Sequence, residues 1–420
     1  MPLRYYDPMF CLTSEKMPFS ICVRVTLKER VKTEALAEAL EKAIPRYPYF
    51  AVRVVREKNE YITVPNPLPI VIYEGDEPLP FGGKELNYHL FALSVSGATL
   101  CFHMSHVLTD GCGFFPFVKT ILYYYFCASH HTVLDPAGIR LADAPFEEDE
   151  LGNPFPEAAM AKAKALYEPP EKPYFRLTDG GYVTDRNATV YRLRISEAEM
   201  MRFSFDHDGS PCAFISALLA AAIRDVHPEE ERDIVSAISL NMRPALGNRG
   251  SYRMLCSSLP IRYPVRLRGA SMQKLCTCTR GMITLQSQKE NVLAMAQKRR
   301  ERMEKLLEID DLARKKEILS KEALADSIAN TFSISYVGQM GLGAMEPFID
   351  SIYSLTDGSL YQTVFIEVSA VNGWFDIAFQ QGFSSDVYYR AFLARLEACD
   401  LYFLEEPPIP FGTAQILLPE

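Results

Sequence analysis

Two residues at the end of a predicted strand have the types and the spacing of a catalytic base with its support. The segment "CFHMSHVLTDGCGFF" (residues 101–115) runs from an apolar stretch into a glycine-rich bend that contains His106 and, four residues later, Asp110. An imidazole can take a proton near neutral pH, because its unperturbed pKa is about 6.5. The carboxylate could orient that imidazole, or it could hold the bend by pairing with an arginine. The spacing fits both roles, and the same spacing also arises by chance around structural histidines.

The residues around this pair indicate how the chain presents it. His103 alternates with apolar neighbours inside the strand, so we expect it in a wall and not as the base. His106 falls where the strand ends, and side chains at strand ends are commonly aimed into a crevice by the rigid sheet. Gly111 and Gly113 permit a positive φ or a close approach of another backbone. A buried helix is predicted directly after them.

The elements that must hold the bend in place follow from the spacing of apolar residues. Alternating runs predict strands, and apolar residues at helical spacing predict helices. Strands are predicted at 20–27, 49–55, 86–95, 98–104, 188–196, 234–244 and 331–341, with a hairpin at 365–383 turning at "NG". Helices are predicted at 32–47, 114–129, 212–226, 287–308 and 386–403.

The same order of elements occurs in both halves of the chain. Residues 91–111 and 366–386 occupy equivalent places, each forming a hairpin that leads into a bend and a helix, which suggests a duplication. The second copy reads "QQGFSSD" where the first reads "SHVLTDG", so the expected chemistry occurs once. Prolines are frequent between the halves. We therefore predict an N-terminal domain at 1–135, a crossover linker at 136–175 and a C-terminal domain at 176–420.

Composition narrows the class of protein. The chain has 420 residues, 48% of them hydrophobic, and a formal net charge of −9, which argues against a general nucleic-acid binder. We expect no secretory signal and no membrane span. The scattered cysteines favour a cytoplasmic location. Cys276 and Cys278 form a C-x-C pair without a second pair at zinc-like spacing, so we expect no metal site.

Four segments in matching order carry a resemblance to a known superfamily. "SHVLTDG" resembles the H-H-x-x-x-D-G signature of the CoA-dependent acyltransferase superfamily, which includes chloramphenicol acetyltransferase, condensation domains of peptide synthetases and alcohol acetyltransferases. The other three segments resemble the early helix and strand, the "N-x-R" strand with its loop, and the "S-N-x-G" strand. They are "ALEKAIPRYPYFAVRVV" (39–55), "SLNMRPALGNRGSYRML" (239–255) and "TFSISYVGQMG" (331–341).

The resemblance implies an α/β (α+β) fold of two similar chloramphenicol-acetyltransferase-like domains. Each is a mixed sheet flanked by helices, with an active-site tunnel between them. It implies His106 as the general base and Asp110 as the loop support, with Arg243 as the partner of Asp110. Ser335 is the candidate oxyanion donor, and we group it with Gly111 and Arg243 as residues that bind the co-substrate.

The implied reaction moves an acyl group from a thioester to a hydroxyl or amine acceptor. No cofactor is expected to stay bound, and acyl-CoA or an acyl-phosphopantetheine is the expected co-substrate. A freestanding condensation-type enzyme fed by a carrier protein, and a non-catalytic binding protein that retains the fold, remain alternatives. Ser105 replaces the first histidine of the signature, and Tyr336 replaces an asparagine after Ser335. A monomer or homodimer is expected.

Overall fold

The computed structural model describes residues 5–6, 8–11, 13, 19–156, 160, 163–180, 189–327, 330–356, 364–410, 412 and 414–419. Its principal elements form two large mixed sheets and a small three-stranded one. The strands are β1 (Tyr5–Tyr6), β2 (Ser20–Leu27), β3 (Val52–Glu57), β4 (Glu60–Pro65), β5 (Ile72–Glu74), β6 (Phe91–Ser96), β7 (Thr99–Ser105), β8 (Thr189–Ser196), β9 (Ile234–Asn241), β10 (Cys256–Tyr263), β11 (Phe332–Gln339), β12 (Ile349–Thr356), β13 (Val364–Val371), β14 (Trp374–Gln381) and β15 (Phe403–Pro410). The helices are α1 (Thr33–Ala43), α2 (Gly111–Ser129), α4 (Glu197–Asp206), α5 (Pro211–Val226), α6 (Arg243–Leu246), α7 (Met272–Gln286), α8 (Lys289–Leu307), α9 (Leu312–Ser327) and α10 (Val387–Ala398).

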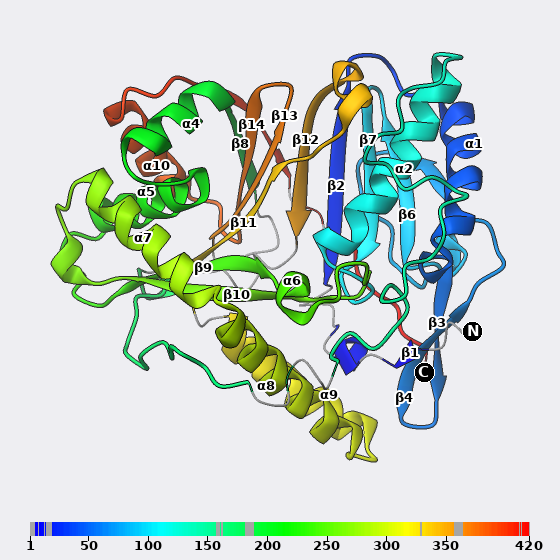
Figure 1. Cartoon of the computed structure of the whole chain (residues 1–420), viewed down its shortest axis with the longest axis horizontal. Helices are drawn as coiled ribbons and strands as arrows, with labels where there is room; N and C mark the ends of the chain where they lie inside the picture. Colours follow the sequence, from blue (N-terminus) through cyan, green and yellow to red (C-terminus); the bar gives the residue numbers. More distant parts are fainter. Residues whose placement is uncertain are drawn as a thin grey trace.

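The five-stranded sheet has the order β12-β2-β7-β6-β5 and carries the histidine-containing bend at the end of β7. Side chains alternate across it, so Val23 of β2 and Phe102 of β7 face the core that α1 and α2 complete. Cys22 and His103 lie on the opposite face. Figure 1 shows α1 and α2 beside β6 and β7.

The seven-stranded sheet has the order β10-β9-β11-β13-β14-β8-β15. Its apolar face, which includes Ile334, Ile366 and Ile377, packs with α5, α7 and α10 into a second core. Five of its strands reproduce the topology of the other sheet, because β11, β13, β14, β8 and β15 follow one another with the same parallel and antiparallel pairings as β5, β6, β7, β2 and β12. The duplication expected from the sequence pattern is therefore present in the topology.

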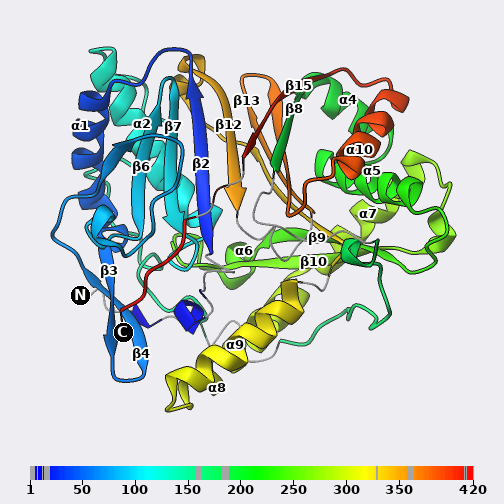
Figure 2. The ribbon, with the colours of Figure 1, turned by 180° about the vertical axis from the view of Figure 1, so that it is seen from behind.

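One strand joins the two parts of the molecule. β12 comes late in the chain, yet it pairs antiparallel with β2, from Ile349 opposite Leu27 to Thr356 opposite Ile21. In both views it stands between β2 and the β13–β14 hairpin (Figures 1 and 2). The predicted domain boundaries at residues 135 and 175 divide the chain by sequence position. The five-stranded sheet crosses this division, because its edge strand β12 comes from the second half of the chain.

The predicted strands and helices are present, with ends that shift by a few residues. The "NG" hairpin has Asn372 and Gly373 at its turn, both with positive φ, as a two-residue turn between twisted strands requires. The sequence did not predict β1, β4, β5, β10, β12, β15, α4, α6, α7 or α9. No single described helix is both long and apolar enough to cross a membrane; α4 and α5 meet that criterion only jointly, with a 78° bend between them.

Candidate active site

A cavity of about 1170 Å³ lies where the end of β7 faces the seven-stranded sheet. One wall comes from the bend and the start of α2, including His106 and Gly111. Another comes from β9 and β10, and a third from β11 and β13, where Ser335 is found. Pro169–Tyr174, from the segment between the halves, also contribute to its lining. The cavity is therefore built from both halves of the chain, as the expected tunnel would be.

His106 is half-buried at the cavity wall, and its ring is held from one side. Nδ1 lies 2.9 Å from the backbone carbonyl oxygen of Thr109. A carbonyl can only accept a hydrogen bond, so Nδ1 carries the proton and Nε2 keeps its lone pair. The ring of Phe19 packs edge-on against the imidazole. Burial lowers the pKa of His106 below its ordinary value, so the ring is neutral at pH 7.

Asp110 anchors the bend and does not orient the imidazole. Its side chain is almost fully buried, at 2% exposure, and caps α2 by accepting from the backbone N–H of Gly113 at 3.0 Å. Its other contacts are with Arg243, whose Nη1 and Nη2 lie 2.9 and 2.8 Å from its two oxygens, and with the N–H of Leu255 at 2.7 Å. Of the two roles left open by the spacing, the contacts support the loop anchor.

The ion pair of Asp110 with Arg243, implied by the resemblance, is present. The assignment of Arg243 to co-substrate binding requires correction, because this residue is absent from the described lining of the cavity. Arg243 is 3% exposed, and its guanidinium also donates to the carbonyl of Ser251 and to Asn241. It lies behind the bend, where it neutralises a buried carboxylate.

The two glycines of the bend differ in what they permit. Neither has a positive φ. A Cβ at Gly113 would lie 2.1 Å from the carbonyl oxygen of Tyr252, so the backbone of the β9–β10 connection can approach α2 only because this side chain is missing. Gly111 lines the cavity, and a Cβ there would meet the ring of Phe115 at 3.2 Å. Of the two glycines, Gly113 is therefore the one at which another part of the backbone packs too closely to leave room for a side chain.

Ser105, in place of the first histidine of the signature, lies away from the described cavity lining. It is fully buried on the same sheet face as His103, and no partner for its hydroxyl is found among the described residues. His103 bonds to Ser94 at 2.8 Å and stacks on Tyr73. Burial lowers the pKa of His103 to about 4. His103 lies outside the described lining of the cavity, so the expectation that it forms part of the wall is not met.

Ser335 and an acidic residue that the sequence analysis missed share the far wall of the cavity. Ser335 of β11 lies directly opposite Glu367 of the neighbouring parallel strand β13, so the two side chains leave the same face of the sheet next to each other. Both line the cavity, as does Tyr336. The available signal for Glu367 was a carboxylate in the middle of "VFIEVSAV", a strand that is otherwise apolar apart from Ser369.

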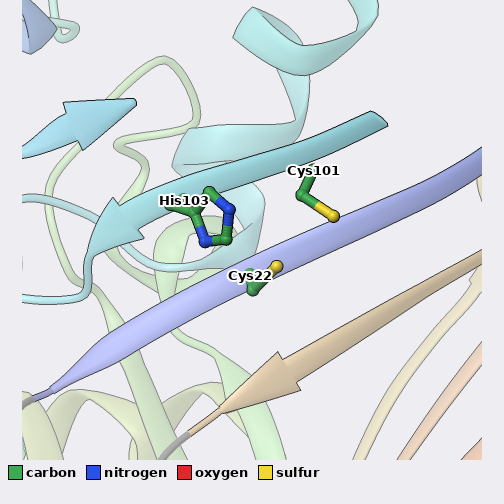
Figure 3. A group of neighbouring side chains, drawn as sticks. All are labelled: Cys22, Cys101 and His103. Carbon is green, nitrogen blue, oxygen red and sulfur yellow. The ribbon is translucent and has the colours of Figure 1, made fainter. Parts of the chain in front are cut away.

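Three possible metal ligands also come together, contrary to what the spacing indicated. The ligand atoms of Cys22, Cys101 and His103 all lie within 4.8 Å of one another (Figure 3). Sequence spacing could not reveal this cluster, because Cys22 comes from β2 and faces the other two across the strand pair. The guanidinium of Arg24 is close enough to influence both thiols. None of the three lines the cavity described above.

No protein-family model matches the sequence, and no curated protein is significantly similar to it. Among solved structures, the chain is similar to polyketide synthase associated protein 5 from Mycobacterium tuberculosis, with 14% identity, a TM-score of 0.60, and coverage of 94% of this chain and 97% of that one. It is also similar to TRI101 from F. sporotrichioides, determined with coenzyme A and T-2, with 11% identity, a TM-score of 0.58 and coverage of 95% and 98%.

A third similar structure is the first condensation domain of the CDA synthetase, with 11% identity, a TM-score of 0.54, and coverage of 91% of this chain and 90% of that one. At such identities the likeness concerns the fold. It extends over nearly the whole of each chain and includes both sheets. The chain therefore shares the fold of these structures, and this is the two-part α/β fold that the sequence resemblance implied.

Proposed function

We propose that the protein is an acyltransferase that moves an acyl group from a thioester to a hydroxyl or amine acceptor, with His106 as the general base. One observation carries the proposal. At the wall of a large cavity, the Thr109 carbonyl fixes the proton on Nδ1 of His106, and Nε2 has no partner among the described residues. A neutral imidazole with a free Nε2 is the form that accepts a proton.

The reaction proceeds by addition and elimination. Nε2 of His106 takes the proton of the acceptor as its oxygen or nitrogen attacks the thioester carbonyl carbon. The carbonyl oxygen gains the negative charge, and the hydroxyl of Ser335 donates a hydrogen bond to it. The C–S bond then breaks, and the imidazolium returns its proton to the leaving thiolate. Asp110 and Arg243 hold the bend and stay outside these steps.

Acyl-CoA is the proposed donor, and a carrier-bound acyl group is the second candidate. TRI101, of similar fold, was determined with coenzyme A, which supports the first. Similarity to condensation domains supports the second. Both donors present a thioester on a phosphopantetheine arm, so both require the same base and the same oxyanion donor.

Thiol release tests this function. The protein is incubated with acyl-CoAs of increasing chain length and a panel of small alcohols and amines, and free thiol is followed. H106A is expected to lose about 10²–10⁴-fold in rate, the usual contribution of a positioned base. H131N is the matched control, because His131 is exposed beyond the far end of the 19-residue helix α2, about 28 Å along it.

The outcomes separate the candidates. Release that survives in H106A would remove His106 as the base. A protein that binds coenzyme A by thermal shift but turns over only a carrier-bound donor would be a condensation-type enzyme. No release from any donor, together with no thermal shift, would identify a binding protein that kept the fold.

A further inference from the structure

Glu367 is a buried acid without a charge partner in the wall of the proposed active site. It is 5% exposed, in the middle of the seven-stranded sheet. No lysine, arginine or histidine of the described residues pairs with it, and its Oε2 has no hydrogen-bond partner among them. A carboxylate buried in this way loses its hydration without compensation, so the neutral acid is favoured. Burial raises the pKa of Glu367 to about 8.

The surroundings of Glu367 supply few other charges. On β11 it faces Ser335, and Tyr336 is the next residue along that strand. On β14 it lies opposite Ala378, and Asp376, two residues away on the same face, is paired with Arg194. From β12, the cavity receives only the hydroxyls of Ser354 and Thr356 among the described residues. The rest of the described lining includes His106, which is neutral at pH 7, Arg262, which is paired with Asp233, and Glu171 and Lys172 of the segment between the halves.

Because Ser335 lies next to Glu367, the protonation state of Glu367 decides where the Ser335 hydroxyl can direct its proton. A serine hydroxyl has one proton to donate. If Glu367 were ionised, it could only accept, and the charge-assisted bond would draw the Ser335 proton toward it and away from the cavity. If Glu367 is protonated, its own O–H can donate to Ser335 Oγ. The Ser335 proton is then free to point at a substrate oxygen.

We propose that Glu367 is a positioning residue that keeps its proton at neutral pH, donates it in a hydrogen bond to Ser335, and thereby directs the Ser335 hydroxyl toward the thioester carbonyl oxygen. No bond to carbon is made or broken at Glu367. The proton stays on its carboxyl group through the cycle, and the negative charge on the carbonyl oxygen is met by the Ser335 O–H. This role rests on the acyl transfer proposed above.

The pH dependence of turnover tests this role. With the donor that releases thiol fastest, kcat/KM of the wild type is expected to fall above about pH 8, approaching tenfold per pH unit, because ionised Glu367 reverses the bond to Ser335. In E367Q the side-chain amide donates to Ser335 at every pH. The alkaline fall is therefore expected to disappear, with the rate near neutral pH within a few-fold of wild type.

Two variants serve as comparisons. S335A is expected to lose about 10²–10³-fold at neutral pH, the usual effect of removing one oxyanion donor. E397Q makes the same change at an exposed glutamate on α10, outside the described lining of the cavity, and its profile is expected to match that of the wild type. An unchanged alkaline fall in E367Q would overturn the proposal, since a merely structural glutamate would leave it in place.

A second measurement does not depend on turnover. Difference infrared spectra between neutral and alkaline pH are expected to show the carbonyl stretch of a protonated carboxylic acid in the wild type and in D376N, and not in the E367Q/D376N double variant. D376N is needed beside them, because burial raises the pKa of Asp376 to about 7. If no donor is turned over but the band is found, the acyltransferase fails and the protonated Glu367 stands. If the band is missing at neutral pH, the inference about Glu367 fails.

Discussion

At the residue scale, contacts with neighbouring groups decide which nitrogen of His106 is free and which role Asp110 can take. The imidazole of His106 has one available nitrogen because a backbone carbonyl occupies the other. Asp110 has no freedom to assist it, because its oxygens already accept from Arg243, Gly113 and Leu255. The bend thus separates two tasks that the His-x-x-x-Asp spacing could have combined.

As the pH is lowered, kcat/KM is expected to fall with a midpoint below 6.5, the ordinary pKa of histidine. Burial lowers the pKa of His106 from 6.5, so the ring stays neutral, and able to take a proton, at pH values where an exposed histidine is charged. The midpoint of the acidic fall in kcat/KM should therefore be under pH 6.5, measured with a non-titrating alcohol acceptor. A midpoint at or above 6.5 would contradict the buried, carbonyl-bound position of His106.

The buried ion pair of Asp110 with Arg243 is expected to contribute strongly to the free energy of unfolding. The exposed pair of Asp386 with Arg390, in the equivalent bend of the second half, is expected to contribute little. D110N leaves Arg243 charged and buried, and removing one partner of a buried pair costs about 3–5 kcal/mol. The matched control is D386N, in the equivalent bend before α10, where Asp386 pairs with Arg390 on the surface. That change is expected to cost less than about 1 kcal/mol. Urea unfolding measures both, and equal losses would contradict the anchoring role of Asp110.

At the element scale, the hairpin, bend and helix form the unit that presents His106, the proposed base. β6 and β7 fix the direction in which the chain leaves the sheet, and α2 begins at once with its cap from Asp110. The β9–β10 connection packs directly on that beginning, where Gly113 leaves room for the backbone of Tyr252. The second unit, β13, β14 and α10, repeats the geometry without a histidine.

Gly113 is expected to be intolerant of a single methyl group. G113A places a Cβ 2.1 Å from the Tyr252 carbonyl oxygen, so backbone must move, at a cost of about 1–3 kcal/mol. G281A is the control, because Gly281 lies inside α7 with nothing within 4 Å of an added Cβ. It is expected to stabilise by about 0.5–1 kcal/mol. Thermal unfolding is expected to show a lower melting temperature for G113A and a higher one for G281A. If G113A left the melting temperature unchanged, the close approach of Tyr252 to Gly113 would be contradicted.

At the scale of the whole molecule, the cavity exists because two similar sheets are joined by β12. This strand pairs with β2 along its length, and it also binds the second sheet, where Asp376 and Gln380 of β14 accept from the N–H groups of Ile352 and Thr356. The hydroxyl of Ser369 on β13 donates to the carbonyl of Ile352. Removal of β12 would expose the backbone hydrogen-bonding groups of β2 in the five-stranded sheet. It would also expose the polar side chains of Asp376 and Gln380 in the seven-stranded sheet.

The two sheets are therefore expected to unfold together. Trp374, the single tryptophan, lies on β14 and reports on the seven-stranded sheet, whereas far-UV circular dichroism reports on all elements. The two urea transitions should coincide, which is the test of a cooperative unit. A tryptophan transition displaced from the dichroism transition would show that the halves unfold separately and that β12 does not couple them.

Much of this arrangement could be predicted from the sequence because it depends on local pattern. Period-two and helical spacing predicted the strands and helices around His106, and the repeated order of elements predicted the shared topology. Neither β12 nor its position in the sheet was predicted. Its partner β2 lies more than three hundred residues earlier, and the pattern of a strand does not show which strand it will pair with. β15 escaped because prolines interrupt "FLEEPPIP", which only an edge strand tolerates.

The sequence by itself determined the fold class, the candidate base, and the expectation that an arginine would meet Asp110, because motifs and periodicity are properties of neighbouring residues. Only the tertiary structure decided that Arg243 lies behind the bend and outside the described cavity lining, and that Gly113 is the glycine that allows a close approach. It alone brought Ser335 and Glu367 together in the lining of a cavity that also includes His106. The reason is physical: burial and partnership depend on what packs against a residue, and here those neighbours come from the other half of the chain.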